Sequence, residues 1–178
     1  MHARTVKLLD SIERKSVIPT PFAQHRGAVQ DAWIDANEHM NVAYYVVAFD
    51  RATDDFFDYV GLTRDYREGA NCTTYALELH ATYVRELKLG QNYLITTQLL
   101  DGDNKRLHFF HQMYNDTPRE SERYLAATLE GISMHIDRTG PRGAPFPDAM
   151  THHVQAIVDA HGQLPRPRQA GSVIGIRR

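Results

Sequence analysis

The chain has 178 residues, of which 42% are hydrophobic and 24% charged, and its formal net charge is −2 at pH 7. This balance is ordinary for a globular domain, and the absence of a positive excess argues against a nucleic-acid or anionic-membrane binder. The single cysteine, Cys72, excludes an internal disulfide and a cysteine-based metal cluster. Residues 1–17 carry charges throughout, and no apolar run is long enough to span a membrane. We therefore expect a cytoplasmic protein.

The first elements are a weak helix and a strand. Apolar residues at helical spacing allow a short helix over residues 5–17, and a loose N-terminal arm is the alternative. Pro19 and Pro21 prevent a regular helix from continuing there. Residues 22–33 are predicted to form the first strand.

A long amphipathic helix is predicted from Val42 to Gly61. Glycine is a common stop at the end of a helix, and acidic residues lie opposite the apolar side. The predicted buried stripe consists of Tyr45, Phe49, Ala52, Phe56, Tyr59 and Val60.

After this helix the hydrophobic period changes from helical to alternating, which is typical of strands. Four antiparallel strands are predicted, over residues 73–87, 93–100, 107–114 and 124–136. Residues 101–104, Asp-Gly-Asp-Asn, are predicted to form the hairpin turn between the second and third of them.

The C-terminal part begins with a Gly- and Pro-rich linker over residues 139–145. A terminal helix is predicted to start at Pro147 and Asp148 and to end at Gly162. The tail, residues 165–178, contains four arginines and no acid, and we expect it to be mobile or docked on a neighbour. The predicted organisation is an arm over residues 1–18, a main domain over residues 19–147, and a helix with a basic tail over residues 148–178.

Polar residues gather immediately before the long helix. Asp35, Asn37 and His39 combine a carboxylate, a carboxamide and an imidazole, and the first backbone N–H groups of a helix are unpaired. These N–H groups and the positive end of the helix dipole can polarise a carbonyl. The alternative is that Asp35 caps the helix or forms a turn, and that Asn37 and His39 stabilise that turn.

Three segments carry a family resemblance. Residues 35–41, Asp-Ala-Asn-Glu-His-Met-Asn, resemble the Asp-x-Asn-x-His-x-Asn signature of hotdog-fold acyl-CoA thioesterases related to 4-hydroxybenzoyl-CoA thioesterase. Residues 83–90 resemble the aromatic-x-Arg-Glu segment of the same family, which ends in a glycine before the next strand. Residues 105–111 resemble a strand of the betainyl-CoA thioesterase members, and the resemblance covers residues 19–147.

The resemblance implies an α+β hotdog fold, in which an antiparallel five-stranded sheet wraps around one long central helix, here followed by a C-terminal helix. It also implies hydrolysis of a small acyl-CoA, such as betainyl-CoA, by a homodimer or a dimer of dimers, without a cofactor. The implied catalytic residues are Asp35, Asn37, His39 and Glu86, and the implied oxyanion donors are the backbone N–H groups of Met40, Asn41 and Val42. Substrate contacts are expected from Trp33, Glu38, Tyr44 and Tyr45, and CoA contacts from Arg85, Lys105 and Arg106.

Several of these residues also have a purely structural interpretation. Asn41 fits a helix cap, the aromatic residues fit core packing, and Lys105 with Arg106 fits a solvated turn. Glu86 could be ion-paired with Arg85 or Lys88. Glu130 lies on an apolar face of its strand, so we expect a buried arginine or a subunit contact beside it. The ten histidines lack the spacings of known metal sites, so no metal site is predicted.

Glu38 is the main departure from the family pattern. The relatives usually carry a small residue, often glycine, at this position, and often an aromatic residue where this chain has Ala36. Glu38 could narrow the site, act as a second carboxylate or point to solvent. It therefore motivates a non-catalytic acyl-CoA binder as an alternative function. A hotdog hydratase or dehydratase is a further alternative, although its His-containing, Pro-Gly-rich stretch does not precede Val42.

Overall fold

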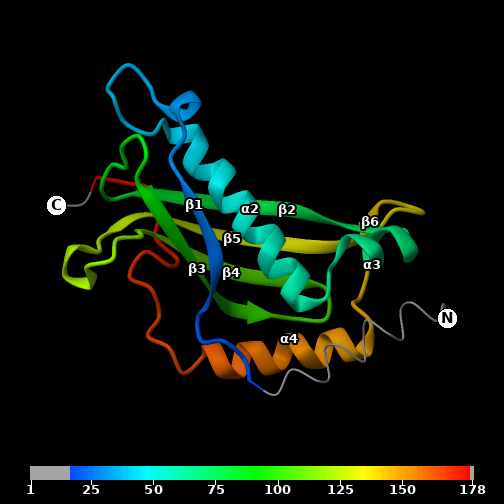
Figure 1. Cartoon of the computed structure of the whole chain (residues 1–178). Helices are drawn as coiled ribbons and strands as arrows, with labels where there is room; N and C mark the ends of the chain where they lie inside the picture. Colours follow the sequence, from blue (N-terminus) through cyan, green and yellow to red (C-terminus); the bar gives the residue numbers. More distant parts are fainter. Residues whose placement is uncertain (1–16, 177–178) are drawn as a thin grey trace.

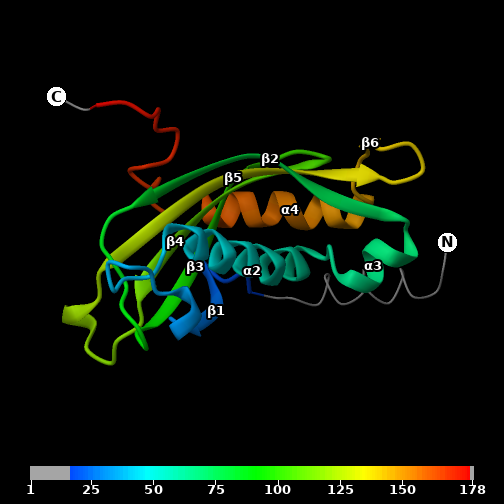
Figure 2. The same cartoon turned by 90° about the horizontal axis from the view of Figure 1, so that it is seen from above.

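The computed structural model describes residues 17–176 and shows a curled antiparallel sheet around a long helix (Figures 1 and 2). The strand order is β1-β3-β4-β5-β2, and the two-residue strand β6 pairs with β5. This arrangement confirms the predicted hotdog fold. The strands are β1 (Phe22–Ala28), β2 (Cys72–Tyr83), β3 (Asn92–Gly102), β4 (Arg106–Asn115), β5 (Leu125–Asp137) and β6 (Arg142–Gly143). The helices are α2 (Val42–Val60), α3 (Arg64–Gly69) and α4 (Asp148–His161), with 3-10 turns η1 (Asp31–Trp33) and η2 (Glu120–Glu122).

Helix α2 has a defined start and stop. The Asn41 side chain caps it by accepting the Ala43 N–H at 3.0 Å, as the structural interpretation of Asn41 predicted. At the other end Gly61 adopts φ 111°, a left-handed conformation that glycine tolerates best, and its N–H bonds to the Phe57 and Asp58 carbonyls. The helix buries Tyr45, Ala48, Phe49, Ala52, Phe56, Phe57 and Val60.

A buried histidine joins α2 to the sheet. The His111 Nδ1 and Nε2 atoms lie 2.9 Å from the hydroxyls of Thr97 and Thr53, and the Thr53 hydroxyl donates to the Phe49 carbonyl. The Thr53 oxygen is therefore the acceptor for an N–H at Nε2, and the Nδ1 atom accepts from Thr97, so both ring nitrogens are satisfied in the neutral form. Burial lowers the pKa of His111 to about 3.

Helix α4 covers part of the β3 edge that β1 leaves open. Strand β1 pairs with β3 only as far as Thr97. Beyond that point the Leu99 N–H donates to His161 Nδ1 at 2.8 Å, while His161 Nε2 lies 2.8 Å from the Pro19 carbonyl. Gln98 donates to the His161 carbonyl at 3.1 Å. The predicted terminal helix is thus confirmed, and its last residue satisfies a strand N–H that would otherwise lack a partner.

The C-terminal tail follows α4 across the sheet face opposite α2 (Figure 2). Glu130 on that face accepts the Gly171 N–H at 2.7 Å, and its other oxygen lies 2.8 Å from His108 Nε2. The expectation of a buried arginine beside Glu130 is corrected, because its partners are a histidine and a backbone amide of the same chain. A subunit contact there stays a prediction. The tail is held on its own sheet at Gly171.

The sequence pattern was less reliable at element ends. The first strand ends at Ala28 rather than at residue 33, β2 ends at Tyr83 rather than at residue 87, and α3 was not predicted. Residues 1–16 lie outside the described range, so the helix predicted there and the domain limits stay predictions. Within residues 17–176, no helix is long and apolar enough to cross a membrane.

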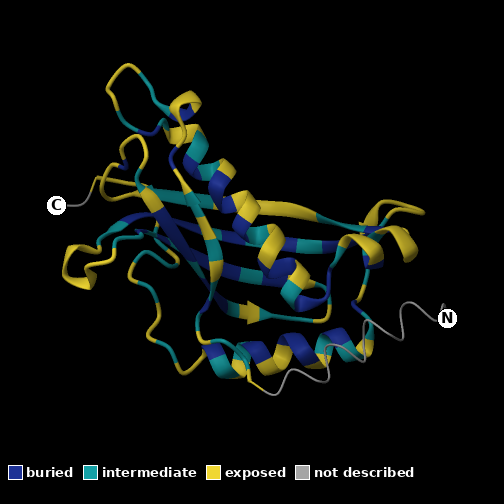
Figure 3. Ribbon diagram, viewed as in Figure 1, coloured by how far each residue is buried: buried dark blue, intermediate teal, exposed yellow. Residues whose placement is uncertain are grey.

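Strand β2 is an uncovered edge of the sheet (Figure 3). Its apolar side chains Tyr75, Leu77, Leu79 and Tyr83 are each 46–50% exposed. The alternation predicted one apolar face, but a β-bulge between Ala76 and Glu78 shifts the register. Tyr75 therefore lies on the same face as Met134, whereas Leu79 and Tyr83 lie on the α2 side, where Tyr83 packs against Tyr45. An exposed apolar edge of this kind is prone to pair with another chain.

We predict that His111 makes the protein sensitive to acid. Its pKa is lowered on folding, so below pH 6.5 the unfolded chain binds a proton that the folded chain does not. The free energy of unfolding then falls by about 1.4 kcal/mol per pH unit from this group, until the pH approaches 3. Urea unfolding between pH 7 and pH 4 measures this slope. His111→Gln is the comparison, and equal slopes for the two proteins would contradict the prediction.

Candidate active site

The polar segment before α2 forms a tight hairpin-like loop. Ile34 and Met40 pair across its base. The Asp35 N–H donates to the His39 carbonyl at 3.0 Å, and the Glu38 N–H donates to the Asp35 carbonyl at 3.0 Å. These bonds place Asp35 and His39 opposite each other at the entrance to the helix.

The two oxygens of the Asp35 carboxylate differ, because one accepts a hydrogen bond within the loop and the other accepts none within residues 17–176. Its Oδ1 atom accepts the Asn37 N–H at 2.8 Å, which is the turn-forming geometry expected of an aspartate in a loop. Within the described residues, the second oxygen has no hydrogen-bond partner in the same chain, and the residue is half-buried. The turn-forming role and a chemical role are therefore compatible for Asp35.

The backbone amides at the start of α2 are not equally available. The Met40 N–H donates to the Leu87 carbonyl and the Asn41 N–H donates to the Trp33 carbonyl, both at 2.8 Å. This corrects the expectation that all three amides could bind an oxyanion. Among residues 17–176, the Val42 N–H has no such partner, and it is exposed at the positive end of the helix dipole.

Residues 84–91, between β2 and β3, lie against this loop. The Leu87 N–H donates to the Tyr45 hydroxyl at 2.9 Å, and the Tyr124 hydroxyl donates to the Glu86 carbonyl at 3.0 Å. Sequence reasoning did not assign Tyr124 to the site, since only the folded sheet brings β5 beside this segment. Glu86 is thereby held next to the loop.

Glu86 has an exposed, ionised side chain close to His39. Its own backbone N–H lowers the pKa of Glu86, and His39, Lys88 and Arg85 lower it further. The Arg85 guanidinium lies 4.0 Å from the centre of the Tyr124 ring, a cation–π contact. The structure thus brings Asp35, His39 and Glu86 to one end of the sheet.

Two of the predicted substrate-binding aromatics are core residues. Trp33 is 5% exposed, stacks on Tyr44 with ring centres 5.5 Å apart, and has the Arg51 guanidinium 5.7 Å from its ring centre. Tyr45 is 4% exposed, its hydroxyl is used by Leu87, and burial raises its pKa. Trp33 and Tyr45 therefore support the loop from behind, and their contact with substrate stays a prediction.

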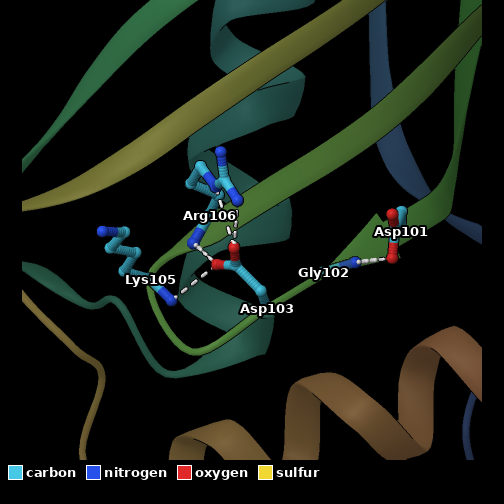
Figure 4. Close-up of polar contacts among 5 residues, drawn as sticks. All are labelled: Asp101, Gly102, Asp103, Lys105 and Arg106. Carbon is cyan, nitrogen blue, oxygen red and sulfur yellow. Dashed lines mark hydrogen bonds and ion pairs between the residues drawn. The ribbon is translucent and has the colours of Figure 1, made fainter.

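Lys105 and Arg106 lie at the other end of the sheet. The loop end of β3 is marked by Tyr93, whose ring stacks near Trp33, and the hairpin end is marked by Gly102. Nine residues at about 3.3 Å each separate these ends by about 30 Å. In addition, Asp103 holds the Arg106 guanidinium through two bonds of 2.6 and 2.8 Å (Figure 4). One chain cannot combine Lys105 or Arg106 with Asp35 in a single site.

The cavities also lie away from the loop. One of about 350 Å³ separates α2 from β2 and is bordered by Val47 and Leu79. A second, of about 560 Å³, lies between the C-terminal tail and the outer sheet face. Neither of these two cavities is lined by a predicted catalytic residue. Within residues 17–176, no three His, Cys, Asp or Glu side chains are placed to hold a metal ion.

Comparison with known proteins agrees with this geometry. The chain is 35% identical over 144 residues to the betainyl-CoA thioesterase of Pseudomonas aeruginosa, covering 81% of this chain and 88% of that protein. It is 32% identical over 151 residues to the L-carnitine dehydrogenase/betainyl-CoA thioesterase of a Rhizobium species, covering 84% of this chain but 29% of that longer protein.

A solved structure is similar to this chain over most of its length. The Staphylococcus aureus protein SAV2348, determined in complex with CoA, superposes with a TM-score of 0.81 at 30% identity, covering 92% of this chain and 99% of that one. The thioesterase-like superfamily matches residues 29–154, which include the loop, strands β2 to β6 and the start of α4. The chain therefore belongs to the thioesterase-like superfamily and is a thioester hydrolase.

Proposed function

We propose that the protein hydrolyses a small acyl-CoA, betainyl-CoA or a related compound, to the free acid and CoA. The observation that carries the proposal is the loop that sets the uncommitted Asp35 oxygen beside the start of α2. The identity to betainyl-CoA thioesterases supports the choice of acyl group. The proposed compartment is the cytoplasm, consistent with the single, unpaired Cys72.

Asp35 acts in one of two ways in this proposal. As a general base it takes a proton from water, which attacks the thioester carbonyl, and as a nucleophile it attacks that carbon itself and is released by water. In both routes the carbonyl oxygen becomes negative, and the Val42 N–H is placed to stabilise it. The C–S bond then breaks and the thiolate takes up a proton.

The remaining polar residues have supporting roles. Asn37 positions the water or the carboxylate, and His39 orients Asp35 or protonates the departing thiolate, with Glu86 close to its ring. A thiol has a reference pKa of about 8.5, so the leaving group needs little acid assistance. The chemistry needs only a carboxylate, an amide and water, so the proposed reaction uses no cofactor, and a chelator should leave the rate unchanged.

The proposal includes a homodimer formed through the β2 edge. The exposed apolar side chains of β2 and the cavity between β2 and α2 are both suited to cover by a partner subunit. In antiparallel pairing of two β2 strands, the Cys72 end of one strand lies beside the Tyr83 end of the other. The hairpin with Lys105 and Arg106 belongs to the Cys72 end, because Arg106 and Tyr75 both pair with Met134. A partner subunit could thus bring these cations toward the CoA phosphates.

We predict that Asp35→Asn and Asp35→Ala lower kcat by about 100-fold or more, because either loses the base or nucleophile. CoA release is measured with a thiol reagent across a panel of acyl-CoAs. Asp31→Asn, an exposed acid in η1, is the matched control and should keep wild-type activity. Full hydrolysis by both Asp35 variants would remove Asp35 from the mechanism.

The same assays separate the alternative functions. Binding of CoA thioesters without release of thiol by the wild-type protein would favour a non-catalytic acyl-CoA binder. A change in enoyl-thioester absorbance without thiol release would favour a hydratase or dehydratase.

We also predict that Leu79→Lys weakens the dimer, because it places a charge at an exposed apolar position of β2 that borders the cavity beside α2. Analytical ultracentrifugation should show a dimer for the wild type and a shift toward monomer for the variant, together with a loss of activity. Val17→Lys changes an equally apolar, 78% exposed residue outside β2 and serves as the control. An unchanged dimer in Leu79→Lys would argue against pairing at this edge.

A further inference from the structure

Glu38 has an unusual backbone conformation for a glutamate. Its φ is 62°, and Asn71, with φ 51°, is the only other non-glycine residue with a positive φ in the described part of the chain. In this left-handed region the Cβ atom approaches the following carbonyl oxygen, so glycine is the favoured residue and asparagine is tolerated. The loop therefore has a position for glycine, and this chain fills it with a glutamate.

The Glu38 side chain does not contribute to holding the loop. Its backbone N–H makes the turn bond to the Asp35 carbonyl, which any residue could make. The carboxylate is exposed, and within residues 17–176 it forms no hydrogen bond or ion pair. The backbone strain at Glu38 is thus not offset by a contact of the side chain in the same chain. Because this strained residue lies in the loop that carries Asp35, the strain points to a functional role for the Glu38 carboxylate.

The chemistry of a quaternary ammonium explains what this carboxylate could recognise. Such a group has no N–H to donate, so a protein binds it through an aromatic face or through a negative charge. The face of Trp33 is already occupied by Arg51 and Tyr44, and Tyr45 is buried. Of the two acids in the loop, Asp35 forms the turn, whereas the Glu38 carboxylate makes no hydrogen bond or ion pair within residues 17–176.

We propose that the Glu38 carboxylate selects the acyl group by charge, favouring a cationic acyl-CoA over a neutral one of the same shape. The inference rests on the proposed thioesterase function and assigns a specificity-determining residue to that site. The attraction acts between an exposed carboxylate and a cation, so it weakens as salt concentration rises.

The test compares two substrates that differ in one atom. Betainyl-CoA carries a trimethylammonium group, and 3,3-dimethylbutyryl-CoA carries a carbon in place of the nitrogen. We expect Glu38→Gln to lower kcat/KM for betainyl-CoA by about tenfold, mainly through KM, and to leave the neutral substrate within about twofold of wild type. The ratio of the two kcat/KM values should also fall in wild-type protein as salt is added.

Glycine variants separate charge selection from backbone strain. Glu38→Gly and Asn71→Gly both relieve a positive φ, so each should raise Tm, by about 2–4 °C for Glu38→Gly. Only Glu38→Gly should lose the preference for the cationic substrate, because Asn71 lies at the start of β2, at the opposite end of the sheet.

Failure of the inference and failure of the proposed function give different results. A wild-type protein that hydrolyses both substrates with the same ratio as Glu38→Gln and Glu38→Gly would overturn the role of Glu38 alone. No hydrolysis of either substrate would overturn the proposed function. In that case calorimetric binding of the two matching non-hydrolysable thioethers still tests Glu38, since equal affinity ratios in wild type and Glu38→Gln contradict charge selection.

Discussion

The hydrogen bond from the Met40 N–H to the Leu87 carbonyl is the contact on which the candidate site depends. It joins the loop before α2 to the segment after β2, and the Tyr45 hydroxyl fixes the same segment by accepting the Leu87 N–H. Glu86 lies about 50 residues after Asp35 and His39 in the chain, so contacts of this kind are needed to keep the three residues at one end of the sheet. The bond also commits the Met40 amide, which leaves Val42 as the available donor.

The sequence predicted what local chemistry determines and missed what the fold determines. The α2 stripe and the Asn41 cap follow from neighbours in sequence, and the structure confirms both, except that Tyr59 of the stripe is only partly buried. Whether Trp33 faces substrate or core depends on Arg51 and Tyr44, which pack on it only after folding. The distance between Lys105 and Asp35 likewise depends on strand register, which the motifs do not reveal.

The alternating pattern of β2 misled because a β-bulge between Ala76 and Glu78 shifts the register within the strand, and the period of the sequence does not reveal that bulge. In this chain Leu77 and Leu79 are half exposed, whereas the core is filled by α2 against the other strands. Asp35 lies at one end of the sheet, and the cations expected to bind CoA lie at the other end, about 30 Å away. A partner strand paired antiparallel to β2 would cover the exposed side chains and bring the partner's cations toward Asp35, so a test of the proposed dimer is also a test of the proposed CoA contacts.

The two interpretations of Asp35 turn out to describe different oxygens of one carboxylate. Oδ1 forms the turn with the Asn37 N–H, and the other oxygen, which has no hydrogen-bond partner within residues 17–176, is the one that the proposed reaction uses. An asparagine in place of Asp35 keeps a carbonyl oxygen for the turn but offers an amide nitrogen, which is neither a base nor a nucleophile, in place of the second oxygen. Alanine loses both functions. A loss of activity shared by the two substitutions therefore reports on the chemistry of Asp35, and a loss confined to alanine reports on the turn.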